Sequence, residues 1–394
     1  MKKILFDLTK IQPVNGSKYH GGGKYGVEVF KKLTEMSPNR IVGYYDEKRY
    51  ISPMIKALCE QYCIPLINCS EKTIADAIEQ TNACLYSPLF DSAYYKIKSN
   101  NIIVMTIHDM RPLEMVGDLY EKYYKHPRKL VGRLLMMLGL NNLRQHFIQK
   151  RKYAEVLRQQ RKIFEQPNFR IVTVSEHSKM AMMSFIPSLK MNDVQVFYSP
   201  STVDEKLHVP PQNKEYGKYY LIVSGNRWLK NSVRAIIAFD QLFTDRPNFK
   251  GRVVITGLTS FNQITLKIKN KNRFKCVGYV DEIELASLYQ NAYALIYPSL
   301  NEGFGYPPLE AMYRGCPVIA SATASITEIC GDSVIYFNPY LIKEIQMRVL
   351  SLENVRLRDY IIKKGKEREH LIRIKQKRAL CDLCKYILSL GEQL

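Results

Sequence analysis

The chain has 394 residues, which is more than a single hydrophobic core usually supports, so two domains are expected. Apolar residues make up 46%, enough for sizeable cores, but no uncharged apolar run approaches the length of a bilayer span, which argues against a transmembrane protein. The formal net charge of +21 is compatible with a nucleic acid, an anionic membrane or anionic substrates as partners.

The nine cysteines are scattered, and several lie in apolar, strand-like runs. Cys381 and Cys384 form an isolated pair on a helical pattern, without a second pair or a histidine partner, so neither a zinc site nor a redox site is expected. Free buried thiols are typical of a reducing, cytosolic compartment. The chain starts with a strand pattern rather than a signal peptide, and we therefore expect a cytoplasmic protein.

Alternating strands and helices are expected in the N-terminal half. The loop after the first strand contains Gly21, Gly22, Gly23 and Lys24, and an amphipathic helix is expected over residues 27–33. In doubly wound folds such a loop binds phosphate-bearing ligands. It lacks a G-x-G-x-x-G with a ribose-binding acid, so a dinucleotide fold is not supported, and a flexible turn is an equal alternative. The strands are expected at residues 4–8, 41–45, 83–86, 102–107, 170–174 and 194–198.

His108 and Asp109 follow the strand expected at residues 102–107. Open α/β sheets bind ligands at the C-terminal ends of their strands, so this histidine lies where a functional side chain is expected. A histidine that only makes structural hydrogen bonds is the alternative, which the residues alone leave open. Asp109 is expected to orient the backbone or the imidazole.

Residues 116–166 form a strongly basic segment. Thirteen lysines and arginines, against two acidic residues, lie between Lys122 and Arg170. The largely apolar stretch 130–140 is too short to cross a bilayer but suits its surface, and residues 149–164 have the pattern of a basic helix. The segment is either an interfacial element that docks on anionic lipid or a solvated insertion that packs on the N-terminal domain.

The polar stretch 210–217 is the expected linker to a second α/β domain. Arg227 and Lys230 lie at a glycine-led helix entrance, three positions apart, so that they can point the same way. An arginine fork and a lysine charge beside free helix N–H groups can clamp a diphosphate, whereas two solvated cations are the alternative. The strands of this domain are expected at residues 219–223, 252–256, 275–279, 292–298 and 317–320, and two of its helices at 232–243 and 284–290.

Residues 297–321 combine the end of a strand, a loop with Gly303 and Gly305, and a helix that opens on a proline pair and stops at a glycine. The glycines let the backbone approach a ligand, and the free N–H groups at the helix start attract an anion. Glu302 and Glu310, eight positions apart, cannot bind phosphate, so they should accept hydrogen bonds from hydroxyls beside it. Phosphate and hydroxyls together describe a nucleotide or a nucleotide-linked sugar.

This Glu-x7-Glu spacing within a glycine–proline frame resembles the signature of retaining glycosyltransferases of family 4, bacterial-type group 1 enzymes with the GT-B fold. A Glu310 that merely complements the helix dipole is the alternative. The resemblance covers the C-terminal domain with specific motifs and the N-terminal domain more loosely. The residues that carry it are Glu302, Gly303, Phe304, Gly305, Tyr306, Pro307, Glu310, Ala311, Gly315, Pro317, Val318, Ile319, Ala320 and Ser321.

The resemblance implies an α/β protein with two Rossmann-like, doubly wound domains that face each other across a cleft. Residues 1–205, with the basic helical insertion at 116–166, would bind the acceptor. Residues 215–378 would bind the nucleotide sugar, and residues 379–394 would form a helix that packs back on the N-terminal domain.

The resemblance also implies a role for each matching residue. Glu302 would bind hydroxyls of the donor sugar, Glu310 the ribose, and the backbone near Val280 the edge of the base, while His108 would face the sugar. The implied catalytic residues are Glu302, His108, Arg227 and Lys230, the donor-binding residues are Arg227, Lys230, Glu302, Gly303, Phe304, Gly305, Tyr306, Glu310 and Val280, and the residues lining the acceptor side of the cleft are Gly21, Gly22, Gly23 and Lys24.

The implied reaction moves a sugar from a UDP- or GDP-sugar to a glycan or lipid-linked acceptor, with retention, in the synthesis of surface polysaccharide or glycoconjugates. Front-face substitution needs no enzymatic nucleophile, and its main requirement is stabilisation of the departing diphosphate by Arg227, Lys230 and the helix dipole. The sequence contains no visible metal cluster, and we expect neither a metal nor a cofactor beyond the nucleotide sugar. Docking of the basic segment would make the protein peripheral on the inner face of the cell membrane.

Two other functions are considered. A nucleotide-sugar epimerase or an inverting transferase could use the same fold. A basic nucleic-acid-binding protein would account for the charge of +21, but it would need basic residues interleaved with aromatic stacking platforms. The charge is instead concentrated in one helical stretch, so no nucleic-acid partner is expected.

Overall fold

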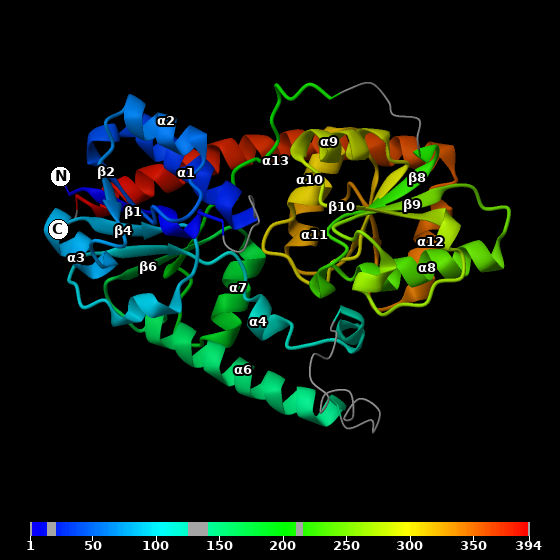
Figure 1. Ribbon diagram of the computed structural model, residues 1–394, viewed down its shortest axis with the longest axis horizontal. Coiled ribbons are helices and arrows are strands. Elements are labelled where there is room, and N and C mark those ends of the chain that lie inside the picture. Colours follow the sequence, from blue (N-terminus) through cyan, green and yellow to red (C-terminus); the bar gives the residue numbers. More distant parts are fainter. Residues whose placement is uncertain (1, 14–20, 125–140, 210–215, 393–394) are drawn as a thin grey trace. The chain divides into compact units, whose positions relative to one another are not determined.

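The computed structural model describes residues 2–13, 21–124, 141–209 and 216–392, with the backbone alone for 141–149 (Figure 1). The chain forms two compact units. The N-terminal unit consists of Met1–Leu113, Ala154–Thr202 and Arg373–Leu394, and the C-terminal unit consists of Glu114–Tyr153 and Val203–Ile372.

The N-terminal unit is built on a 7-stranded sheet in the order β3-β2-β1-β4-β5-β6-β7, and every neighbouring pair is parallel. Parallel strands need crossover connections, which helices supply here. The strands are β1 (Ile4–Asp7), β2 (Ile41–Tyr45), β3 (Leu66–Asn68), β4 (Cys84–Ser87), β5 (Ile103–Thr106), β6 (Phe169–Thr173) and β7 (Val194–Val196). The helices of this half of the chain are α1 (Gly21–Met36), α2 (Pro53–Gln61), α3 (Ile74–Thr81), α4 (Arg111–Glu114), α6 (Asn141–Phe164) and α7 (Glu176–Phe185).

The C-terminal unit repeats this plan with a 6-stranded parallel sheet in the order β10-β9-β8-β11-β12-β13. The strands are β8 (Tyr219–Ile222), β9 (Arg252–Thr256), β10 (Phe274–Gly278), β11 (Ala294–Tyr297), β12 (Val318–Ser321) and β13 (Ile335–Phe337). The helices are α8 (Ser232–Asp245), α9 (Glu282–Asn291), α10 (Tyr306–Tyr313), α11 (Ser325–Cys330), α12 (Ile342–Ser351) and α13 (Val355–Leu390), which continues into the N-terminal unit. Both sheets therefore have the doubly wound, Rossmann-like order.

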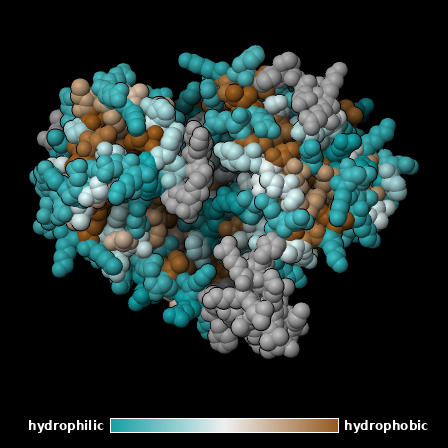
Figure 2. Space-filling model, viewed as in Figure 1, coloured by the Kyte–Doolittle hydropathy of each residue, from teal (hydrophilic) through white to brown (hydrophobic). Residues whose placement is uncertain are grey.

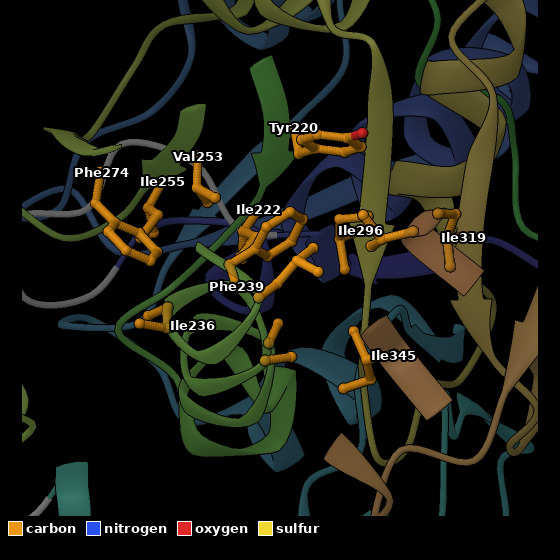
Figure 3. Close-up of a cluster of buried hydrophobic side chains, with 14 of the residues drawn as sticks. Tyr220, Ile222, Ile236, Phe239, Val253, Ile255, Phe274, Ile296, Ile319 and Ile345 are labelled. Carbon is orange, nitrogen blue, oxygen red and sulfur yellow. The ribbon is translucent and has the colours of Figure 1, made fainter. Parts of the chain in front are cut away.

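The main core of the C-terminal unit lies between its sheet and helices α8 and α12 (Figure 3). Ile222, Ile255 and Ile296 contribute from three strands, Phe239 from α8 and Ile345 from α12, and all five are almost fully buried. Strands of a parallel sheet are covered on both faces, which is why their sequences are nearly continuous apolar runs. That pattern made the strands visible in the sequence.

All eleven expected strands are present, with their ends shifted by at most two residues, which confirms the doubly wound α/β fold. The strands that were not expected are β3 (Leu66–Asn68) and β13 (Ile335–Phe337), each of 3 residues at an edge of its sheet. Edge strands this short carry too few buried side chains to produce a pattern.

The expected glycine loop before helix 27–33 is wrong, because helix α1 already begins at Gly21. The glycines serve close packing. A Cβ on Gly26 would lie 2.1 Å from Cγ2 of Ile11, and one on Gly22 would lie 2.5 Å from Cδ2 of Leu89. Only glycine allows the helix to approach these neighbours so closely. Gly21 differs, since a Cβ there would meet nothing within 4 Å.

The expected boundary of the N-terminal domain differs from the structure in the segment that precedes the basic helix. Residues 114–124, placed within the expected N-terminal domain of residues 1–205, belong to the C-terminal unit. The physical reason is that Tyr120, Tyr123 and Tyr124 pack against the core of that unit. At the other end of the chain, residues from Arg373 onward belong to the N-terminal unit, where the Arg40 guanidinium donates to the carbonyl of Leu388 at 2.9 Å.

The surface seen in Figure 2 is mainly hydrophilic, with hydrophobic residues in small groups. Among the helices within the described parts of the chain, none is long and apolar enough to cross a membrane. The apolar stretch 130–140, proposed from the sequence as a membrane-surface element, lies outside the described residues.

Candidate functional site

The topological switch point of the C-terminal sheet is the boundary between β8 and β11, where the strand order reverses direction. In open α/β sheets, ligands bind beyond the C-terminal ends of the strands at this point. The loop after β8 carries Arg227 and Lys230, and the loop after β11 carries Glu302 and Gly303. Side chains that are far apart in the sequence therefore meet at one edge of the sheet.

Lys230 and Glu302 form a buried ion pair in which the ammonium Nζ lies 2.6 Å from carboxylate Oε1. Both side chains are 10% exposed. The ammonium also donates to the hydroxyl of Tyr297 at 3.1 Å. Burial, together with the Glu302 charge, raises the pKa of Tyr297 well above its usual value, so its hydroxyl stays protonated. The site therefore holds a charged, desolvated pair in the loops that follow β8 and β11.

Hydroxyl side chains hold the loop that carries Glu302. The Ser299 hydroxyl donates to the Glu302 carboxylate, and Ser325 donates to the carbonyls of Glu302 and Phe304 at 2.8 and 2.9 Å. Ser321, the last residue of β12, donates to the Ser299 carbonyl at 2.5 Å. Tyr297 and Ser299 were not predicted from the sequence as parts of the site. A serine directly after an apolar strand at the switch point is the signal that could have found Ser299.

The backbone before α10 is shaped for close approach by a ligand. Gly305 has a φ of +118°, a conformation that residues with a Cβ rarely adopt, and a Cβ there would meet nothing within 4 Å. Helix α10 begins at Tyr306, with Pro307 in its first turn, as the sequence predicts. The free N–H groups of a helix start favour an anion. The side chain of Phe304, in the same loop, is buried.

Glu310 lies in α10 and is half-buried. The hydroxyl of Tyr289, on α9, is almost fully buried. Burial and, to a smaller extent, the negative charge of Glu310 raise the pKa of Tyr289 well above its usual value. The second carboxylate of the Glu-x7-Glu motif is thus more accessible than Glu302.

Arg227 and Lys230 occupy different environments, although the sequence allows them to point the same way. Arg227 precedes the short 3-10 helix Trp228–Lys230 and is exposed, whereas Lys230 is buried and donates a hydrogen bond to Glu302. The two cations therefore do not form a clamp of equal partners. Val280 lies between β10 and α9 and is half-buried.

His108, in the N-terminal unit, lies just after β5 as predicted. Its Nε2 is 2.9 Å from the carbonyl oxygen of Pro88, and since a carbonyl can only accept, Nε2 carries a proton. The imidazole meets the ring of Tyr25 edge-on at a centroid distance of 4.6 Å. The carboxylate of Asp109 lies 2.5 Å from Nη2 of Arg111 and accepts a hydrogen bond from the Arg111 backbone N–H. Of the two roles predicted for Asp109, orienting the backbone or orienting the imidazole, these contacts favour the backbone.

Gly21, Gly22, Gly23 and Lys24 form the first turn of α1 in the N-terminal unit. The structure therefore brings Lys230, Glu302 and the start of α10 together in one unit, while His108 and this turn belong to the other. Within the described residues, no group of three or more His, Cys, Asp or Glu side chains could hold a metal ion.

The C-terminal unit is similar to proteins of a known family. Residues 203–368 match the family model described as glycosyl transferases group 1. This range includes all six strands of the C-terminal sheet. Over these residues the C-terminal unit is similar to the group 1 glycosyltransferases. The chain is 32% identical over 148 residues to the O-antigen chain mannosyltransferase RfbU of Salmonella typhimurium, a match that covers 36% of this chain and 41% of that protein. The chain thus spans less than half the length of the curated relatives it matches first.

Solved structures match this chain over its whole length. Sucrose-phosphate synthase from Thermosynechococcus elongatus matches with a TM-score of 0.65 and 14% identity, covering 100% of both chains. The Anabaena protein HepE in complex with UDP-glucose matches with a TM-score of 0.62 and 14% identity, again over 100% of both chains. At this identity the likeness establishes the fold, which is GT-B, as the sequence resemblance implied.

Proposed function

We propose that this protein is a retaining glycosyltransferase that moves a sugar from a nucleoside-diphosphate sugar to a hydroxyl of a glycan or lipid-linked saccharide, in the synthesis of surface polysaccharide. The relatives named as mannosyltransferases favour mannose as the sugar. The donor nucleotide is UDP or GDP. The observation that carries the proposal is the buried Lys230–Glu302 pair at the switch point, next to the helix start that follows Gly305.

The chemistry follows from these positions. The bond between the sugar C1 and the phosphate oxygen breaks while the acceptor oxygen bonds to C1 on the same face, and the acceptor proton passes to the departing phosphate oxygen. Negative charge develops on the diphosphate, so cations and N–H groups fixed beside it lower the barrier. Arg227, Lys230 and the start of α10 supply these groups. Glu302 accepts hydrogen bonds from donor-sugar hydroxyls and Glu310 from the ribose, and neither acts as a nucleophile.

We propose further roles for the remaining predicted residues. His108 faces the donor sugar, the turn at Gly21 and Lys24 contacts the acceptor, and the backbone near Val280 pairs with the edge of the base. The cations make a metal unnecessary, so turnover should survive EDTA, and no other cofactor takes part.

Helix α6 supports peripheral binding to an anionic membrane, close to a lipid-linked acceptor. Lys150, Arg151, Lys152, Arg158 and Arg161 are exposed on this helix. Each basic residue near an anionic surface contributes about 1 kcal/mol to binding. Liposome flotation tests this step: the protein should co-float with vesicles containing phosphatidylserine at low salt, and failure to do so would remove the membrane from the proposal.

A screen of nucleotide sugars tests the main proposal. Ligands that bind the folded state raise the melting temperature, so UDP-, GDP- and ADP-sugars are compared by thermal shift. The stabilising donor is then incubated with a saccharide acceptor, and NMR of the product should show the same anomeric configuration as in the donor. An inverted product would identify an inverting transferase, and a donor epimer without transfer would identify an epimerase. Tight binding of DNA without any sugar transfer would overturn the proposal.

A further inference from the structure

Residues 114–124 come from the middle of the N-terminal half of the sequence, yet they pack on the C-terminal unit. The two carboxylate oxygens of Asp118 accept from Nη1 and Nη2 of Arg234, on α8, at 2.9 Å each. The side chains are 8% and 5% exposed, respectively. The Tyr120 ring centroid lies 3.9 Å from the Arg234 guanidinium carbon.

A second contact anchors the end of the 3-10 helix Leu119–Tyr124. The Tyr124 hydroxyl lies 2.7 Å from the hydroxyl of Ser232 and accepts from the backbone N–H of Val233 at 3.0 Å. Both bonds are made at the first residues of α8. The segment thus covers the N-terminal end of the helix that follows the Arg227–Lys230 loop.

Arg234 continues this contact toward the site. Its Nη1 also donates to Oδ1 of Asn231 at 2.9 Å, which fixes the orientation of the Asn231 amide. The other end of that amide, Nδ2, donates to the carbonyls of Pro298 and Pro339 at 3.0 Å each. Asn231 has a φ of +54°, and it directly follows Lys230. A left-handed residue that is not glycine needs such contacts to hold it.

The same contacts reach the partner of Lys230. Pro298 directly precedes Ser299, whose hydroxyl donates to the Glu302 carboxylate. A continuous set of bonds therefore runs from Asp118 through Arg234 and Asn231 to the loops that carry Lys230 and Glu302. A buried ion pair is weak evidence for stability, because desolvation offsets its Coulomb energy, and its better-attested value is the specification of one geometry.

We propose that Asp118, Arg234 and Asn231 are positioning residues that hold Lys230 and Glu302 in their paired geometry. Through them, the segment 114–124 sets the turnover of the glycosyltransferase domain rather than its affinity for the nucleotide. This inference rests on the proposed function only in assigning turnover to the Lys230–Glu302 pair.

The test variant is Asp118→Asn, which keeps the size of the side chain and removes its charge. We expect kcat to fall about tenfold while KM for the nucleotide sugar stays within about threefold. Asp118→Glu should recover part of the rate, because a carboxylate can still meet the guanidinium. The matched control is Asp245→Asn, at the other end of α8, where the exposed pair with Lys343 leads nowhere near the site, and kcat should not change.

A second measurement needs no activity. The contacts from Asp118 through Arg234 to Asn231 are called the relay below. If the relay acts on Lys230, the losses in melting temperature caused by Asp118→Asn and Lys230→Met are coupled. The melting temperature of the double variant then falls by less than the sum of the two single losses, with a difference of roughly 2 °C or more. Asp245→Asn combined with Lys230→Met should be additive. Additive losses for Asp118→Asn, or a kcat of this variant within twofold of the wild type, would overturn the relay. A wild-type protein that transfers no sugar, but shows the coupling, would overturn the proposed function and leave the relay standing.

Discussion

Removing the charge of Lys230 tests the buried pair most directly. Lys230→Met keeps the length of the side chain but leaves the Glu302 carboxylate, 10% exposed, without its cation. Breaking a buried pair from one side costs about 3–5 kcal/mol, because the remaining charge is uncompensated. We expect the lower end, about 3 kcal/mol, since the Ser299 hydroxyl still donates to that carboxylate. For a unit of this size, this free energy lowers the melting temperature by roughly 6–12 °C.

The double variant Lys230→Met/Glu302→Gln separates stability from activity. It removes both charges, so much of the lost free energy of unfolding should return, whereas turnover should stay roughly 100-fold or more below the wild type. Thermal and urea unfolding measure the first quantity, and kcat for the preferred nucleotide sugar measures the second. Lys343→Met is the control, because its ion pair is 72% and 57% exposed and should contribute less than about 1 kcal/mol.

Three outcomes would contradict this expectation. If Lys230→Met unfolds like the wild type, the pair is not desolvated as the structure indicates. If the double variant is no more stable than Lys230→Met, the two charges are not coupled. A double variant with wild-type turnover would instead refute the assignment of the pair to catalysis.

Two further predictions concern the packing inside each unit. Gly26→Ala should destabilise the N-terminal unit by about 1–3 kcal/mol in urea unfolding, because its Cβ would lie 2.1 Å from Cγ2 of Ile11. The control is Gly21→Ala, which should be nearly neutral because its Cβ would meet nothing within 4 Å. Equal effects of the two substitutions would contradict the packing role of Gly26. Burial raises the pKa of the Cys316 thiol to about 12, so iodoacetamide should label the exposed Cys63 in the folded protein but not Cys316, as judged by mass spectrometry before and after unfolding.

The parts of the fold that the sequence predicts are those determined by local patterns. Strands buried on both faces are continuous apolar runs, and the helix start at Tyr306 is marked by prolines and glycines. The short edge strand β3 has only one buried residue, the polar Asn68, so it lacks the apolar pattern that predicts a strand. The glycines from Gly21 onward are ambiguous in the same way, since glycine serves a loop and close helix packing equally well.

The parts of the site that the sequence misses depend on topology. Lys230 and Glu302 were both predicted as site residues, but their pairing joins positions 72 residues apart and follows from β8 and β11 being neighbours. The pair between Asp118 and Arg234 joins positions 116 residues apart. In the sequence, Asp118 is an acidic residue in a loop without any distinguishing motif. Its pairing with the buried guanidinium of Arg234 depends on the tertiary structure, so no local pattern could have predicted it.

The different burial of the two predicted cations divides the work between them. Lys230 is held by Glu302 and Tyr297, so its conformational entropy has already been lost in the folded protein, and its charge is balanced. Such a group contributes preorganised geometry rather than net attraction for a diphosphate. Arg227 is exposed and solvated, so it adds net positive charge but must be ordered when the ligand binds. In the proposed reaction, attraction of the donor therefore rests on Arg227 and the start of α10, and the alignment of the leaving group rests on Lys230.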